Sequence, residues 1–250
     1  VIFYISQHIL NDEKISLVFA AVYLINPGTL WSNWYDFHLE AFIPLFTALT
    51  YYYYYKENKT GITLSILMLI SILERNVFTA VAFVVYFITR EAYNKKRKKA
   101  INRAITPLLI SSIIIFSLVY FFYSENYINY LAVNRGESNL ESIIGFISYN
   151  NILSKISYLA ILTIPLAFLQ IDAPLELIPA GPYLLLVALT SYTPYFEITW
   201  QYPSIITVPF FISAIMGAKK GHKYLIPKII ILSSIFFLIL SPGTPIMAKL

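Results

Sequence analysis

The stretch WSNWYDFHLEAFIPLFTALTYYYYY, residues 31–55, joins a polar, aromatic cluster directly to an apolar segment. The apolar part, residues 41–55, has no charged side chain and no period-two alternation, which is typical of a membrane helix and not of a barrel strand. Three ionisable residues, Asp36, His38 and Glu40, lie at the mouth of this segment. Ionisable groups there cost free energy unless they face water or a protein cavity. The stretch therefore predicts a membrane helix and a functional site at its end.

Composition extends the helix prediction to the whole chain. Hydrophobic residues make up 58%, charged residues 12%, and the mean hydropathy is +0.67, values outside the range of soluble globular domains. A helix in hydrocarbon satisfies its own backbone hydrogen bonds. We therefore expect an all-α, polytopic transmembrane helical bundle with about nine to ten membrane helices, some short or re-entrant. The apolar segments are 1–10, 15–30, 39–55, 61–73, 76–89, 105–123, 152–171, 175–190, 203–217 and 225–241.

The domain prediction is one transmembrane domain over residues 1–250, a fragment of a longer membrane protein, because both ends look like interrupted elements. The chain has no cysteine, which excludes disulfides, thiolate metal sites and cysteine nucleophiles. It also lacks the nucleotide-binding and hydrolase motifs of soluble enzymes. Few methionines with many tyrosines and isoleucines suggest an archaeal or thermophilic composition.

Basic residues predict the orientation. Lys56 and Lys59 precede segments 61–73 and 76–89, and a run of basic residues from Arg90 to Arg103 follows them. The positive-inside rule places both clusters in the cytoplasm, which requires a helical hairpin and not one long tilted helix. Fourteen of the 18 basic residues then lie inside, so we expect the cell membrane as the location. The net charge of +5 is thus an orientation signal, and no nucleic-acid partner is expected.

The outer face then carries the polar aromatic loops 31–38, 124–151 and 191–202, together with the hairpin tip at 74–75. In an extended chain Asp36, His38 and Glu40 share one face and could hold a divalent cation or act as a general base. On a helix only Asp36 and Glu40 align, and Asp36 could instead be an N-cap, with Glu40 near the positive end of the dipole. Both interpretations stay open.

Two further groups are candidates. Glu74 could act on a substrate from a polar cavity at the hairpin tip, with Arg75 holding a phosphate, or the two could form a simple salt bridge. Trp200, Gln201 and Tyr202 could contact sugar or lipid, although an aromatic belt also explains them and the run from Tyr51 to Tyr55. Asp172 and Glu176 are expected near a cytoplasmic helix end, and the prolines between 165 and 194 are expected to set kinks and helix ends.

Three motifs carry a family resemblance: DFHLE at 36–40, ILER at 72–75 after a short apolar helix, and WQYP at 200–203 before an apolar run ending at Gly217. Together they resemble the polytopic membrane family called domain of unknown function 2079 (DUF2079). The family is expected to have Glu-Asp where this chain has Glu74-Arg75, so a paired-carboxylate role does not carry over.

That family is similar to membrane glycosyltransferases of the GT-C fold, which take sugar from a polyprenyl-phosphate carrier on the outer face. The resemblance implies that Asp36 is the second acidic position, with a first one upstream of Val1. It also implies that His38 and Arg75 face the lipid phosphate. The expected partners are therefore membrane lipid and a polyprenyl-phosphate-linked sugar. A polytopic transporter or flippase without catalytic chemistry, and a scaffold that keeps the fold, are the alternatives.

Overall fold

The structure is a computed structural model that describes residues 1–34, 38–73, 76–93, 113, 151–190 and 192–242. These residues form α-helices joined by short 3-10 or π segments, and none of them lies in a strand. The all-α prediction is therefore confirmed for this part of the chain. The α-helices are α1 (Ile2–Leu10), α2 (Glu13–Ile25), α3 (Pro27–Trp34), α4 (Ile43–Tyr55), α5 (Lys59–Ile72), α6 (Asn76–Tyr93), α10 (Ile152–Thr163), α11 (Gly181–Leu189), α12 (Ser204–Gly217) and α13 (Ile226–Leu240). The expected segment 105–123 and loop 124–151 fall outside the described residues, Ile113 excepted.

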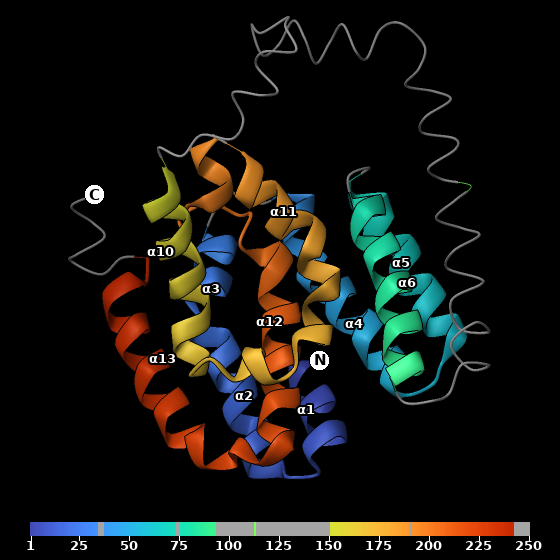
Figure 1. Cartoon of the computed structure of the whole chain (residues 1–250), viewed down its shortest axis with the longest axis horizontal. Coiled ribbons are helices and arrows are strands. Elements are labelled where there is room, and N and C mark those ends of the chain that lie inside the picture. Colours follow the sequence, from blue (N-terminus) through green and yellow to red (C-terminus); the bar gives the residue numbers. More distant parts are fainter. Residues whose placement is uncertain (35–37, 74–75, 94–112, 114–150, 191, 243–250) are drawn as a thin grey trace, which may run out of the picture.

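Helix α12 is the centre of the molecule (Figure 1). All 14 of its residues are buried, and it packs against α1, α3, α4, α10 and α11. The sequence explains this position, because α12 is apolar around its whole circumference and only Ser204, Thr207 and Ser213 interrupt it with small hydroxyls. A uniformly apolar helix is buried by its neighbours, so α12 organises the helices that surround the candidate site.

The expected apolar segment 15–30 is two helices. Asn26 is extended, with φ −66° and ψ 132°, because the residue before a proline avoids the α conformation. Pro27 then begins α3, and the Asn26 side chain accepts a hydrogen bond of 3.0 Å from the Gly28 N–H. The axis bends by 47°. Helix α3 runs on to Trp34, so the predicted outer loop 31–38 is wrong over its first four residues.

The predicted hairpin also consists of two separate helices, and one long tilted helix is excluded. Helix α5 ends at Ile72, and Leu73 is extended with φ −150° and ψ 138°. Helix α6 starts at Asn76, whose side chain donates a hydrogen bond of 2.9 Å to the Leu69 carbonyl. The C-terminal end of α5 and the N-terminal end of α6 lie at the upper end of the molecule in Figure 1.

The expected segments 152–171 and 175–190 are much less regular than predicted. Only α10 and α11 are α-helical, and between them lie three 3-10 segments: η3 (Ile164–Leu166), η4 (Leu169–Asp172) and η5 (Pro174–Ala180). Pro165, Pro174 and Pro179 fall within these segments, which confirms that the prolines interrupt helices. Ala167 and Phe168 have positive φ, at 50° and 58°. Both η4 and η5 pack against α12, so this irregular backbone is covered by protein.

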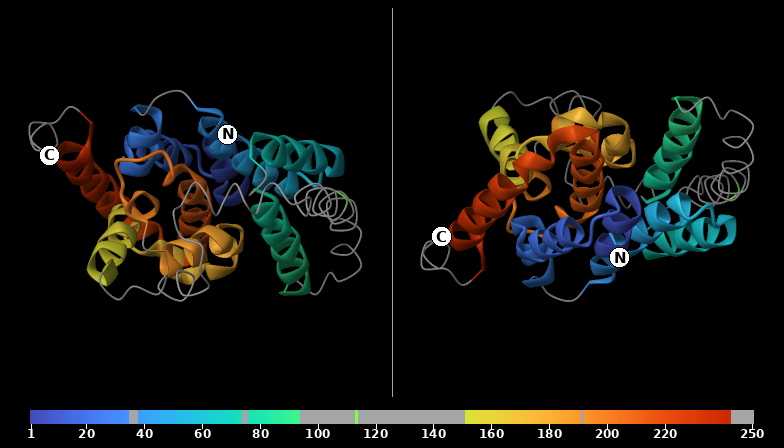
Figure 2. Two further views of the ribbon diagram at one scale, coloured as in Figure 1. Left: turned by 90° about the horizontal axis from the view of Figure 1, so that it is seen from above. Right: turned by 90° about the horizontal axis from the view of Figure 1, so that it is seen from below.

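No single described helix is long and apolar enough to be identified as a membrane span, whereas the bent pair α2 and α3 passes the same length and hydropathy criterion together. Turns gather at two ends of the molecule. The α1–α2 and α12–α13 turns lie at the lower end of Figure 1, whereas the start of α10 and the end of α11 lie at the upper end. These turns, which the sequence assigns to different sides of the membrane, therefore lie at opposite ends of the molecule in Figure 1, and Figure 2 shows the molecule from each of these ends.

Candidate functional site

A cavity of about 410 Å³ lies between α1, α2, α3, α4 and α12. Its walls are mostly apolar, and its volume is in the range of small-molecule sites. Helix α3 approaches α12 closely here, since a Cβ added to Gly28 would lie 2.9 Å from the Thr207 hydroxyl oxygen. The bend at Asn26 and Pro27 turns α3 across this part of the molecule, which allows both α2 and α3 to line the same cavity.

Five hydroxyl side chains line this cavity: Tyr23 from α2, Thr29 and Ser32 from α3, and Ser204 and Thr207 from α12. Ser32 donates to the Gly28 carbonyl at 2.6 Å, and Thr207 donates to the Pro203 carbonyl at 2.7 Å. Thr29 and Ser204 are 8% and 2% exposed. The Thr29 hydroxyl interacts with the Tyr23 side chain, whereas the Ser204 hydroxyl has no hydrogen-bond partner among the described residues. A buried hydroxyl without a partner is costly, so the Ser204 hydroxyl is suited to a ligand in the cavity.

His38 and Glu40, the described members of the predicted group at 36–40, do not line this cavity. Asn33 and Ala41, which bracket that stretch, both line the cavity. His38 is exposed in extended backbone just before η1 (Leu39–Phe42), and Glu40 is half-buried within η1. Asp36 lies outside the described residues, as do Glu74 and Arg75. Because Asp36 is not described, the extended and the helical interpretations of this group both stay predictions.

The second predicted group is joined to the same region through its backbone. The Ser32 hydroxyl lies 3.2 Å from the Gln201 carbonyl oxygen. Gln201 is three residues before Ser204, where α12 begins. Trp200 donates from its indole nitrogen to Glu197 at 2.9 Å, and the Tyr202 ring lies 4.7 Å from that of Tyr195. The structure thus brings Ser32 of α3 and Gln201 of the WQYP motif together, although none of the described predicted side chains lines the cavity itself.

The hydroxyl residues of the cavity were not among the predicted site residues. Thr29, Ser32, Ser204 and Thr207 look unremarkable in the sequence, because small hydroxyl residues in apolar helices usually bond to their own helix. Ser32 and Thr207 do so. The signal that could have found the site is that two such pairs flank the two motifs, with Thr29 and Ser32 before DFHLE and Ser204 and Thr207 after WQYP.

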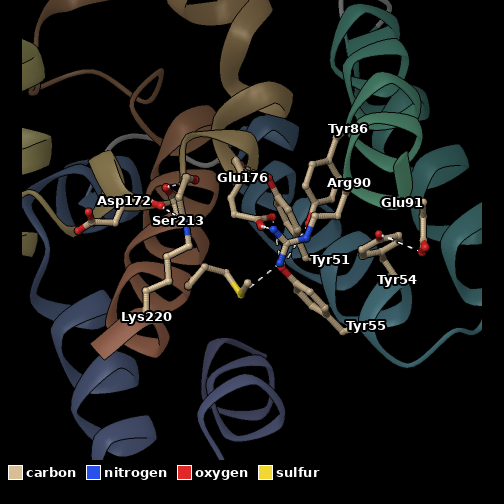
Figure 3. A network of polar contacts seen from close by, with 12 residues as sticks. Tyr51, Tyr54, Tyr55, Tyr86, Arg90, Glu91, Asp172, Glu176, Ser213 and Lys220 are labelled. Atoms are coloured by element: carbon tan, nitrogen blue, oxygen red, sulfur yellow. Dashed lines mark hydrogen bonds and ion pairs between the residues drawn. The ribbon is translucent and has the colours of Figure 1, made fainter. Parts of the chain in front are cut away.

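A second polar cluster lies where α6 meets η5 (Figure 3). Arg90 Nη1 is 3.0 Å from Glu176 Oε1, with side-chain exposures of 15% and 0%. The other guanidinium nitrogen, Nη2, is 3.9 Å from the Met216 sulfur in α12. Burying such charges is tolerated because they are paired. The expectation that Glu176 is simply near a helix end missed this ion pair, since Arg90 and Glu176 are far apart in the sequence.

Tyrosines of α4 and α6 complete this cluster. Tyr51 donates to the Glu176 carbonyl oxygen at 2.6 Å, and Tyr55 donates to Glu176 Oε2 at 3.3 Å. The Tyr55 and Tyr86 hydroxyls are 3.2 Å apart. Tyr54 donates to Glu91 at 3.2 Å. The interpretation of Tyr51 to Tyr55 as an aromatic belt is therefore wrong for Tyr51 and Tyr54, which are buried.

Metal binding stays a prediction. Among the described residues no three His, Asp or Glu side chains are close enough together to hold an ion. Asp36 and Glu74, on which the expected divalent cation depends, are not among those residues.

The described residues form a helical fold with a mostly apolar cavity. The family model of DUF2079, described as predicted membrane protein, matches residues 1–249, so the chain belongs to that family of predicted membrane proteins. The resemblance given by the three motifs is thereby confirmed at the family level. Comparison with curated proteins and with solved structures gives no match.

Proposed function

We propose that this protein is a membrane enzyme that transfers a sugar from a polyprenyl-phosphate donor on the outer face of the cell membrane. The observation that carries the proposal is the 410 Å³ cavity, which is lined by residues close in sequence to two of the three family motifs: Asn33 and Ala41 on either side of DFHLE, and Ser204 directly after WQYP. A polyprenyl-phosphate sugar has an apolar chain and a polar head. An apolar cavity with buried hydroxyls suits both parts.

The predicted residues of the three motifs would supply the chemistry that such a transfer needs. A carboxylate, for which Asp36 is the candidate, takes the proton from an acceptor hydroxyl. The acceptor oxygen bonds to the anomeric carbon while the bond from that carbon to the donor phosphate oxygen breaks. The departing phosphate carries the negative charge. His38 and Arg75 are the candidates to stabilise that charge, and a divalent cation would do the same. Glu40, Glu74 and the Trp200–Tyr202 segment would position sugar and acceptor.

The alternative function is a transporter or flippase that moves a lipid-linked substrate without forming a bond. The same cavity would suit it, and the irregular segment from η3 to η5 is of the kind that broken transporter helices use. The two functions differ in their product. Only the enzyme makes a new glycosidic linkage.

The test uses membranes that contain the protein, a radiolabelled polyprenyl-phosphate sugar and a lipid or protein acceptor fraction. We expect Asp36→Asn to lower the transfer rate by about a hundredfold, because a general base contributes that much or more. His38→Ala is expected to lower it less. Transfer at the wild-type rate in both variants would remove these residues from the chemistry, and movement of intact substrate across the membrane without a new linkage would favour the transporter.

A second pair of variants tests the cavity. Ala41 is exposed and lines the cavity, so Ala41→Trp should obstruct it without disturbing the core. Ala21 is also exposed but does not line the cavity, so Ala21→Trp is the matched control. We expect Ala41→Trp to raise the KM for the donor and Ala21→Trp to leave it unchanged. Equal KM values for the two variants would show that the donor binds elsewhere.

A further inference from the structure

A second cavity, of about 340 Å³, lies between α1 and α4 at the ends where each helix stops. It shares no lining residue with the cavity between α2 and α12. Its walls are polar to a much greater extent. The lining residues are Tyr4, Gln7, His8, Asn11, Tyr52 and Lys56.

The lining side chains are all hydrogen-bond donors, and none is a carboxylate. Lys56 brings an ammonium group, and His8 a ring that donates from both nitrogens when it is protonated. Lys56 and His8 lie at helix C-termini, where the macrodipole favours positive charge. The carbonyls at these ends are occupied: the Asn11 N–H bonds to the Gln7 carbonyl and the Lys56 N–H to the Tyr52 carbonyl, both at 3.0 Å. The cavity is therefore suited to an anion.

Aromatic rings flank this donor-rich surface. Tyr4 is 63% exposed, and the Lys56 ammonium lies 6.0 Å from the centre of the half-buried Tyr52 ring. Tyrosine beside lysine is typical of protein at a membrane interface, where rings contact acyl chains and cations contact head groups. In the predicted orientation Lys56, with Lys14 and Lys59, faces the cytoplasmic leaflet, whose anionic lipids attract basic groups.

We infer that the cavity formed by Tyr4, Gln7, His8, Asn11, Tyr52 and Lys56 binds a phosphate-ester anion, the head group of an anionic membrane lipid. Lys56 and His8 bond to the phosphate oxygens, the Gln7 and Asn11 amides complete the donor set, and the Tyr4 and Tyr52 rings contact the first carbons of the chains. A bound lipid would bridge α1 and α4. This inference is independent of the proposed transfer reaction.

The experiment uses the protein purified in an uncharged detergent and titrated, by calorimetry, with three probes. These are a short-chain phosphatidic acid, a short-chain phosphatidylcholine and inorganic phosphate. We expect saturable binding of phosphatidic acid with a Kd roughly tenfold weaker in Lys56→Gln, since a hydrogen bond to a charged group contributes about that much. Phosphatidylcholine, whose net charge is zero, should bind more weakly.

Lys59→Gln is the matched control, because it removes the same charge from the same exposed turn but Lys59 does not line the cavity. Its Kd should equal that of the wild type, and His8→Gln combined with Lys56→Gln should bind more weakly than either single variant. Lys56-dependent binding of phosphatidic acid alone assigns the site to a lipid, and equal Lys56-dependent binding of inorganic phosphate assigns it to soluble phosphate. Equal losses in Lys56→Gln and Lys59→Gln, tight binding of phosphatidylcholine, or no binding of any probe would overturn the inference.

Discussion

At the level of side chains, Arg90 is held in place by an ion pair with a buried glutamate. Its partner Glu176 is fully buried, and the pair joins α6 to the irregular segment η5. Tyr55 and Tyr51 bond to the same glutamate, at its carboxylate and its carbonyl. Because a buried ion pair is satisfied only as a unit, removal of one partner costs much more than replacement of both.

We therefore predict that Glu176→Leu lowers the free energy of unfolding by about 3 kcal/mol, since it leaves the Arg90 guanidinium largely buried without a carboxylate. The double variant Arg90→Met with Glu176→Leu should be more stable than Glu176→Leu alone, because neither charge remains. Thermal unfolding in detergent of the two single variants and the double variant measures the coupling. Additive losses in the double variant would mean that the pair does not act as a unit.

Helix α12 and the segment η4 approach each other so closely that the contact requires a glycine, Gly217, in α12. A Cβ at Gly217 would overlap the carbonyl oxygen of Leu169, which is backbone and cannot rotate away. Ser213, one turn earlier, donates to the Gln170 and Ala173 carbonyls at 3.0 and 2.8 Å, so the same face of α12 holds the irregular segment in place. Small residues at such contacts are typical of packed membrane helices.

Gly217→Ala should therefore destabilise the protein by about 1–3 kcal/mol, through overpacking against η4. Gly181→Ala is the control, because nothing lies within 4 Å of the Cβ it would add and alanine favours the start of α11. The apparent Tm of each variant in detergent is the measurement. A Gly217→Ala protein as stable as Gly181→Ala would mean that α12 and η4 separate easily.

Helix positions could be predicted where apolar residues run without proline. The expected segments 203–217 and 225–241 agree with α12 and α13 to within a residue, because nothing in them opposes a helix except Pro209 inside α12. Segments 15–30, 152–171 and 175–190 failed at Asn26-Pro27, Ala167-Phe168 and Pro174–Pro179, where backbone conformation departs from the α region. Hydropathy alone does not predict these breaks, because the residues on both sides are equally apolar.

The candidate site could be predicted in part. Ser32, which precedes the motif at 36–40, contacts the Gln201 carbonyl of the motif at 200–203. Asp36 lies outside the described residues, so a site shared by the two motifs stays a prediction. The Arg90–Glu176 pair could not be found from sequence spacing, because its two residues are far apart in the chain. Trp31 illustrates the same limit, since its indole nitrogen donates at 2.6 Å to the Leu240 carbonyl of α13.

At the scale of the whole molecule, the exposed lysines among the described residues give the last prediction. Lys14, Lys59 and Lys228 are exposed at turns or ends that the positive-inside rule assigns to the cytoplasm, whereas Asn33 and Thr193 are exposed near the aromatic motifs at the other end. The chain has no cysteine, so each of these positions can be replaced by a single cysteine without any background thiol.

In intact cells a membrane-impermeant maleimide should label Asn33→Cys and Thr193→Cys. Lys14→Cys, Lys59→Cys and Lys228→Cys should react only after the membrane is permeabilised. Labelling of Lys59→Cys from outside together with Asn33→Cys would contradict the hairpin orientation and, with it, an outer-face transfer site at Asp36. The opposite pattern, with only the lysine positions labelled from outside, would invert the protein and place the cavity mouth in the cytoplasm. A donor presented on the outer face would then not reach it.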